Sequence, residues 1–198
     1  MIDLTLQFLT HELNEHFNRV YGFNSENRIV LSSASSESGV AIPPSKVGVS
    51  LINIEEERVH KEQRTTFLNE NGTYDHYNPE IKLNVFVLFS ANFYDRESGS
   101  MDYLQGLKQL SEVIRFFQGK NVFSPDNSPN LDSSLRKLVV ELYSFSFEQL
   151  YNFWSVVGIK YLPSVLYKVR LLSYQQERTI SPSHEVTALD LQVNTINQ

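Results

Sequence analysis

The sequence predicts one domain of the α/β (α+β) class: a mixed, mostly antiparallel β-sheet flanked by about three α-helices, with long loops and an extended C-terminal arm. Apolar residues recur every three or four positions near the N-terminus, later blocks alternate apolar side chains with period two, and helix-like stretches separate these blocks. At 198 residues and 41% hydrophobic composition, the chain is long enough for one buried core. We assign residues 1–178 to the domain and residues 179–198, which alternate only weakly after Pro182, to the arm.

The first element is an amphipathic helix. Its apolar residues lie three or four positions apart, which places them on one face, and Gly22 is expected to end the helix in the left-handed conformation. The residues that form this stripe are Ile2, Leu6, Leu9, Leu13, Phe17 and Val20.

A short β-branched run from Arg28 to Ser33 follows, and then a loop. Small polar residues and the Pro43–Pro44 pair fill residues 33–45, so we expect an exposed loop without a regular ladder. Residues 47–60 are expected to form a strand, and residues 61–78, with few apolar side chains, a long excursion at the surface.

The segment from Ile81 to Phe93 is the best candidate for the centre of the sheet. Its odd-numbered residues are all apolar, and Phe86 and Leu88 make the other face apolar too. A strand of this kind is covered on both sides.

Two elements come next. Apolar residues from Met101 to Phe117, including Leu104 and Leu107, line one side of a helix that Gly119 closes. After a turn-rich loop at residues 124–129, residues 135–144 alternate again, which indicates a strand with one wet face near an edge.

A second helix start is strongly marked. Ser146 and Gln149 have capping-box spacing, Phe145 and Leu150 have staple spacing, and Gly158 is suited to end the helix. This helix carries Trp154, for which we favour a core position over the alternative role of interface anchor. Residues 164–174 then form a clear strand.

Composition excludes several classes of protein. The formal net charge of -6 opposes nucleic-acid binding, and no cluster of Lys and Arg offsets it locally. The chain has no cysteine for disulfides or thiolate metal sites, and no apolar segment approaches the ~18 residues of a membrane span. We expect neither a nucleic-acid partner nor membrane insertion.

No arrangement of residues points to catalysis, a cofactor or a metal. The five histidines are scattered, and His11 and His16 fall on different faces of the first helix. Glycine-rich phosphate loops are missing, and Ser181, His184 and Asp190 lack the strained elbow of a nucleophile. We therefore expect a protein that is not an enzyme and has no cofactor.

A run of charges favours interaction instead. The strand that begins at residue 47 leads into E-E-E-R-V-H-K, where mixed charge is suited to selecting the register of a partner, although a plain wet edge remains the alternative. The candidate interaction residues are Glu55, Glu56, Glu57, Arg58, Lys61 and Arg170.

Four ordered blocks carry a resemblance to a known family. They are V-S-L-I-N-I-E-E-E-R (Val49 to Arg58), L-N-V-F-V-L-F-S-A-N-F (Leu83 to Phe93), F-F-Q-G-K-N-V-F (Phe116 to Phe123) and Y-L-P-S-V-L-Y-K-V-R (Tyr161 to Arg170). The chain resembles the cap or tail-terminator proteins of phage-tail-like contractile injection systems, in the single-domain form of anti-feeding-prophage-like and Photorhabdus-virulence-cassette-like clusters. The similarity runs from about Ile2 to Tyr174.

The resemblance implies a structural protein with a tail-terminator-like fold. It implies a hexameric ring that ends growth of the inner tube and joins the tube to the distal end of the contractile sheath, so the partners are other copies of the chain, the inner tube protein and the sheath protein. It further implies assembly in the bacterial cytoplasm, followed by incorporation into a particle that is extracellular or membrane-anchored.

Two other functions stay open at this point. One is an assembly factor or baseplate adaptor of the same machine. The other is a small hydrolase or ligand-binding domain whose site is built from residues far apart in sequence, which a deep pocket with convergent polar groups would support.

Overall fold

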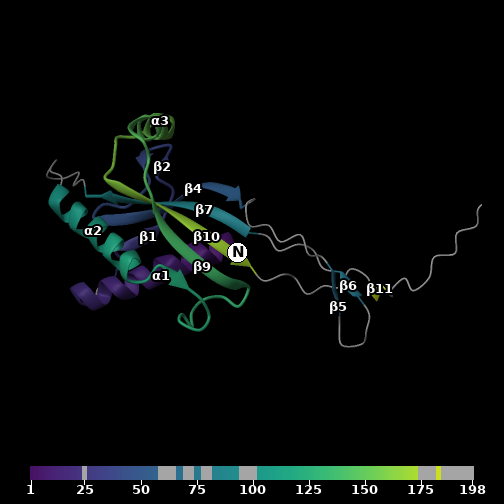
Figure 1. Ribbon diagram of the computed structural model, residues 1–198. Helices are drawn as coiled ribbons and strands as arrows, with labels where there is room; N and C mark the ends of the chain where they lie inside the picture. Colours follow the sequence, from purple (N-terminus) through teal and green to yellow (C-terminus); the bar gives the residue numbers. More distant parts are fainter. Residues whose placement is uncertain are drawn as a thin grey trace, which may run out of the picture. The chain divides into compact units, whose positions relative to one another are not determined.

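The computed structural model describes residues 1–23, 26–57, 66–68, 74–76, 82–93, 102–173 and 182–183 (Figure 1). The chain divides into two units, the first made of Met1–Val59 and Ile81–Tyr174 and the second of His60–Glu80 and Gln175–Gln198. Among the described residues, no helix is long and apolar enough to cross a membrane.

A six-stranded mixed sheet forms the centre of the first unit. Strand β7 lies third in the order, and only the β1–β4 pair is parallel, so the predicted mixed and mostly antiparallel sheet is confirmed. The order is β1 (Ile29–Leu31), β4 (Lys46–Glu56), β7 (Lys82–Asn92), β10 (Ser164–Ser173), β9 (Leu135–Tyr143) and β8 (Val122–Phe123).

Both faces of β7 are buried, as its sequence predicts. Val85, Val87 and Phe89 belong to the larger core cluster, which they share with α1 (Ile2–Tyr21) and α2 (Tyr103–Gly119). Phe86 and Leu88 belong to a smaller cluster with residues of α3 (Phe147–Val157). The sheet therefore separates α1 and α2 on one face from α3 on the other (Figure 1).

Helix α1 is tied to the first strand by a buried amide. Asn14 Nδ2 donates to the carbonyl of Ile29 at 2.9 Å, and Asn14 Oδ1 accepts from the backbone N–H groups of Arg28 and Ile29 at 3.1 Å. The helix ends before Gly22, whose φ of 81° is positive as expected. The expected left-handed helical conformation is wrong, because the ψ of Gly22 is 156° and the chain leaves the helix extended.

Helix α2 buries only part of the predicted apolar side, which included Leu110 and Phe117. It ends at Gly119 as expected, but Leu104 and Leu107 are exposed, and the buried side consists of Gly106, Gln109, Leu110, Glu112, Val113, Phe116 and Phe117. Gly106 explains the rotation. A Cβ atom there would lie 3.2 Å from the ring of Phe93, so the helix approaches β7 through the glycine.

Helix α3 confirms its sequence signals. The Ser146 hydroxyl accepts from the N–H of Gln149 at 3.2 Å, and the Gln149 side chain accepts from the N–H of Ser146 at 2.9 Å. Gly158 ends the helix in the left-handed conformation, with φ 71° and ψ 19°. Phe145 and Leu150 both pack against the cluster that contains Trp154, which is 7% exposed, so the predicted core position of Trp154 is confirmed.

The loop expected at residues 33–45 is more ordered than predicted. Strands β2 (Ser35–Ser36) and β3 (Gly39–Val40) form a small antiparallel hairpin, so the prediction that no ladder forms is wrong. Ile42 is buried beside Gly48, where a Cβ atom would lie 2.4 Å from Ile42 Cγ1. Because Gly48 has no side chain, Ile42 packs directly against its backbone, and this contact holds the segment to the sheet. No local sequence pattern predicts a contact between these two residues.

The described part of the second unit is a small sheet. Strands β5 (Thr66–Leu68) and β6 (Tyr74–His76) pair antiparallel, and β11 (Pro182–Ser183) pairs antiparallel with β6. The predicted excursion at residues 61–78 thus contains a hairpin, and the predicted arm contributes β11; the rest of both segments lies outside the described residues.

Candidate interaction surface

Three of the predicted interaction residues meet around one buried amide, Asn84 of β7. Glu55 of β4 and Arg170 of β10 are its register partners on either side, and Asn84 Nδ2 donates to Glu57 Oε2 at 3.1 Å. Register partners on neighbouring strands point to the same face of a sheet. Glu55, Glu57 and Arg170 therefore lie on the face that carries α3, and we call this group with Asn84 the Asn84 band.

A β-bulge decides which glutamates join the band. Leu51 pairs with Val87 but Asn53 pairs with Phe86, so Ile52 is an extra residue in β4. Before the bulge the odd-numbered residues of β4 face α1 and α2, and after it they face the side of α3. Glu56, the register partner of Leu83, consequently lies on the opposite face from Glu55.

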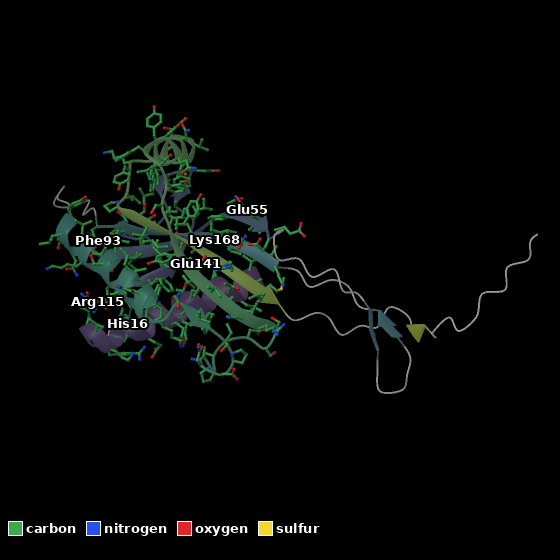
Figure 2. All side chains as sticks on the ribbon, viewed as in Figure 1. His16, Glu55, Phe93, Arg115, Glu141 and Lys168 are labelled. Atoms are coloured by element: carbon green, nitrogen blue, oxygen red, sulfur yellow. The ribbon has the colours of Figure 1, made fainter. Side chains whose placement is uncertain are left out.

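The band continues onto β9 through an ion pair. Arg170 Nη2 donates to Glu141 Oε1, and Lys168 is the register partner of Glu141. Figure 2 labels Glu55, Lys168 and Glu141 on strands β4, β10 and β9. On this face β4 and β9 thus carry acidic groups and β10 carries basic ones, with the neutral Asn84 of β7 between β4 and β10. Charges placed in this way are suited to a partner with a matching pattern of charge.

Two buried atoms of the band, Asn84 Oδ1 and Arg170 Nε, have no hydrogen-bond partner among the described residues. Asn84 is 5% exposed, and its position as the only polar residue between Leu83 and Leu88 is the signal that sequence reasoning overlooked. Unpaired buried polar atoms are costly in a folded chain and are often satisfied by a partner. The predicted residues Arg58 and Lys61 lie outside the described residues.

One edge of the sheet is only partly covered. Strand β8 pairs with Leu138 and Val139 of β9, and the N–H of Val140 donates to Asn121 at 2.8 Å. Backbone groups alternate between the two sides of a strand, so those of Leu142 also point away from β10. In the described part of the chain no strand pairs with β9 beyond Val140 on that side, as expected for a strand near an edge.

Helix α3 presents apolar side chains outward as well as inward. Phe147, Tyr151 and Val156 are 93%, 74% and 87% exposed, although a surface helix normally turns polar residues to solvent. A groove of about 410 Å³ runs beside them, lined by Phe147, Leu150, Tyr151, Trp154, Ser155, Ile159 and Tyr161. Exposed apolar patches of this kind mark contact surfaces.

On the other face, an ion-paired group joins α1 to α2. Glu112 of α2 is 3% exposed; its Oε1 lies 2.7 Å from His16 Nε2 of α1, and its Oε2 accepts from Arg115 Nη1 at 2.8 Å. Figure 2 places His16 and Arg115 on these two helices. The group ties the helices together beneath the sheet. Among the described residues, no three histidine, aspartate or glutamate side chains are grouped as metal ligands would be.

Comparison with known proteins gives the family. The profile of the Pvc16 N-terminal domain matches residues 5–188, nearly the whole chain. The chain belongs to the Pvc16 N-terminal domain family. Among curated protein sequences, none matches it.

Two solved structures share the fold of this family member. The sheath/tube terminator of an extracellular contractile injection system, PVC, in the extended state is 15% identical, with a TM-score of 0.56 over 96% of this chain and 63% of the other. The tube-terminating cap of the anti-feeding prophage is 13% identical, with a TM-score of 0.55 over 92% of this chain and 61% of the other. The chain spans less than two thirds of either protein. The tail-terminator-like fold that the family resemblance implies is confirmed.

Proposed function

We propose that this protein is a structural terminator of a contractile injection system, which ends the inner tube and joins it to the sheath. The observation that carries the proposal is the likeness of 96% of the chain to a sheath/tube terminator, together with membership in the Pvc16 N-terminal family. The site residues fit a contact surface, because charged groups of both signs lie around a buried amide. We propose a structural role rather than a catalytic one.

The decisive experiment is removal of the protein from an assembling particle. Without a terminator, tubes lack a fixed end, so we expect a broad distribution of tube lengths and sheaths that detach, measured by electron microscopy of purified particles. Complementation with the unchanged chain should restore uniform lengths. Uniform particles after deletion would contradict the terminator role. If the complementing chain carries a label, finding that label at the baseplate end of the particle would favour an adaptor instead.

We also propose that the protein forms a hexameric ring. Identical subunits in a ring need heterologous contacts that close, and the Asn84 band supplies charges of both signs for such a contact. Arg170→Ala removes the cation at its centre and should weaken the ring while the monomer stays folded, measured by light scattering and circular dichroism. Lys108→Ala, an exposed change on α2, is the control. An unchanged oligomer would remove Arg170 from the interface.

The free part of β9 is our candidate for strand addition by an extended arm of the sheath. Leu142→Pro with Ser144→Pro removes outward-pointing N–H groups and leaves the pairing of Glu141 and Tyr143 with β10 in place. We expect loss of sheath attachment with tube binding retained. Leu142→Thr with Ser144→Thr, which keeps the N–H groups, is the matched control. Intact attachment in the proline variant would rule out this edge.

In this proposal the finished protein belongs to an extracellular or membrane-anchored particle that is assembled in the bacterial cytoplasm. Fractionation of producing cells and of released particles with an antibody against the chain tests this location, and absence of the protein from purified particles would overturn it.

A further inference from the structure

Two exposed aromatic features lie on opposite faces of the sheet. Phe23, just after α1, is 88% exposed, and α1 packs on the face that carries the larger core cluster. On the other face, the groove beside α3 is lined by the exposed rings of Phe147, Tyr151 and Tyr161. An exposed aromatic ring and an aromatic groove are the two halves of a contact that anchors many protein interfaces.

The C-terminal end of α1 is apolar and basic. Val20 and Tyr21 are exposed beside Phe23, and Arg19 lies in the last turn of the helix. Arg19 Nε donates to the backbone carbonyl of Glu15 at 3.3 Å, and in the described part of the chain no carboxylate pairs with this guanidinium. This end of α1 therefore offers aromatic surface with an uncompensated positive charge beside it.

The groove beside α3 has the complementary character. Its volume of about 410 Å³ is larger than one aromatic side chain, and none of its lining residues is charged. Glu148, in the first turn of α3, forms no ion pair among the described residues. The groove lies on the same face of the sheet as the Asn84 band, so one neighbouring molecule can cover both.

We infer that Phe23 of one copy of the chain inserts into the groove beside α3 of the next copy, with Arg19 placed against Glu148. The second copy supplies the aromatic ring and the opposite charge together. The same chain does not make this contact, because its Phe23 is 88% exposed and the sheet lies between α1 and α3 (Figure 1).

The placement of the two halves decides the symmetry of the contact. Since they lie on opposite faces of the sheet, two copies joined in this way leave one Phe23 and one groove uncovered, and further copies add head to tail. Head-to-tail contacts close into a ring where the rotation allows it. The contact rests on the proposed ring and names one of its interfaces. It needs neither tube nor sheath, so its failure and the failure of the terminator role are measured separately.

Introduced cysteines test the contact, because the chain has none of its own. Val20→Cys with Ser155→Cys keeps Phe23 and the three rings of the groove, and a short bifunctional maleimide should join the full-length double variant into a ladder of species beyond the dimer. Leu104→Cys with Ser155→Cys is the matched control, because Leu104 is an exposed apolar residue on the same face as α1, and it should give no ladder.

Three results of this cross-linking would overturn the inference. They are a ladder that is absent both from concentrated solution and from assembled particles, cross-linking confined to single chains, and products that stop at the dimer. The first result would exclude the contact, the second would mean that each chain fills its own groove, and the third would mean a two-fold pair.

Self-association in sedimentation velocity tests the anchor. Phe23→Asp should weaken association at least about tenfold, while circular dichroism stays unchanged because the ring is exposed. Leu104→Asp, the matched control, should associate like the unchanged chain. Equal association of all three proteins would overturn Phe23 as the anchor.

A charge exchange tests the pairing of Arg19 with Glu148. Arg19→Glu and Glu148→Arg should each weaken self-association about threefold, and the double variant should recover the original association. Lys108→Glu, an exposed charge reversal on α2, should have no effect. A double variant as weak as the two single changes combined would overturn the placement of these two charges.

Discussion

The two faces of the sheet differ in what covers them. On one face, α1 and α2 bury a large cluster that reaches every long strand of the sheet, and the ion-paired Glu112 joins the two helices. On the other face, the eleven residues of α3 cover only part of the sheet, expose three large apolar side chains, and leave the Asn84 band beyond them. The first face carries the larger core cluster, and the second exposes the surface that we propose for contact with partners.

The largest expected effect comes from the first face. Phe89→Ala empties a fully buried ring position of β7 and should lower the free energy of unfolding by about 3–5 kcal/mol, measured by chemical denaturation. Phe147→Ala, at an exposed ring on the second face, is the matched control and should change it by less than about 0.5 kcal/mol. Equal losses in the two variants would remove the contrast between the faces.

Trp154→Ala sharpens the comparison within α3 itself. The residue belongs to the smaller cluster, and its loss should cost about 3 kcal/mol, at the low end for a buried aromatic residue. Tyr151→Ala, one turn earlier on the exposed side, should leave the unfolding midpoint nearly unchanged. A large loss at Tyr151 would show that the outer side of the helix also supports the fold.

Glu112→Ala tests the tie between α1 and α2. The variant removes the acceptor for His16 and Arg115, and we expect a loss of about 2 kcal/mol, because hydrogen bonds to charged groups exceed neutral ones in strength. Glu15→Ala, an exposed glutamate on α1, is the control. No difference between the two variants in thermal unfolding would mean that the contacts of Glu112 do not stabilise the packing of α1 on α2.

The smallest expected effect depends on pH. Burial raises the pKa of Tyr167 to about 12 from its ordinary value of 10.0. A group whose pKa is raised by folding contributes stability that is fully present at pH values below its unfolded-state pKa. This stability is lost as the pH rises through the folded-state pKa. Between pH 8 and pH 10.5 the free energy of unfolding should therefore fall by about 1 kcal/mol more in the unchanged chain than in Tyr167→Phe. Parallel curves for both proteins from pH 8 to 10.5 would contradict this.

Local signals account for much of the fold. The apolar faces of β7, the capping box at Ser146 and the left-handed Gly158 depend on residues close in sequence, and the structure confirms them. The buried face of α2 depends on the close contact between Gly106 and Phe93. The position of Ile42 depends on Gly48, where any side chain would occupy the space that Ile42 fills. These are contacts between distant residues, so periodicity alone placed Leu104 and Leu107 on the wrong side.

The candidate surface was predictable in composition but not in geometry. The glutamate run and Arg170 were found from sequence, and their common partner Asn84 was not, because strand order and register decide which residues are neighbours.

The extra residue at Ile52 decides which face the distal half of β4 presents. If Ile52 were paired regularly instead of bulging, each later residue of β4 would move by one position along β7 and turn over, so that Ile54 would oppose Asn84 and Glu55 would oppose Leu83. Deleting Ile52, by contrast, would remove the bulge and leave the pairing of residues 53–56 with β7 unchanged. Relatives that lack one residue at this position should therefore keep the Asn84 band, whereas relatives that keep the length but lose the bulge should present an aliphatic side chain where Glu55 lies.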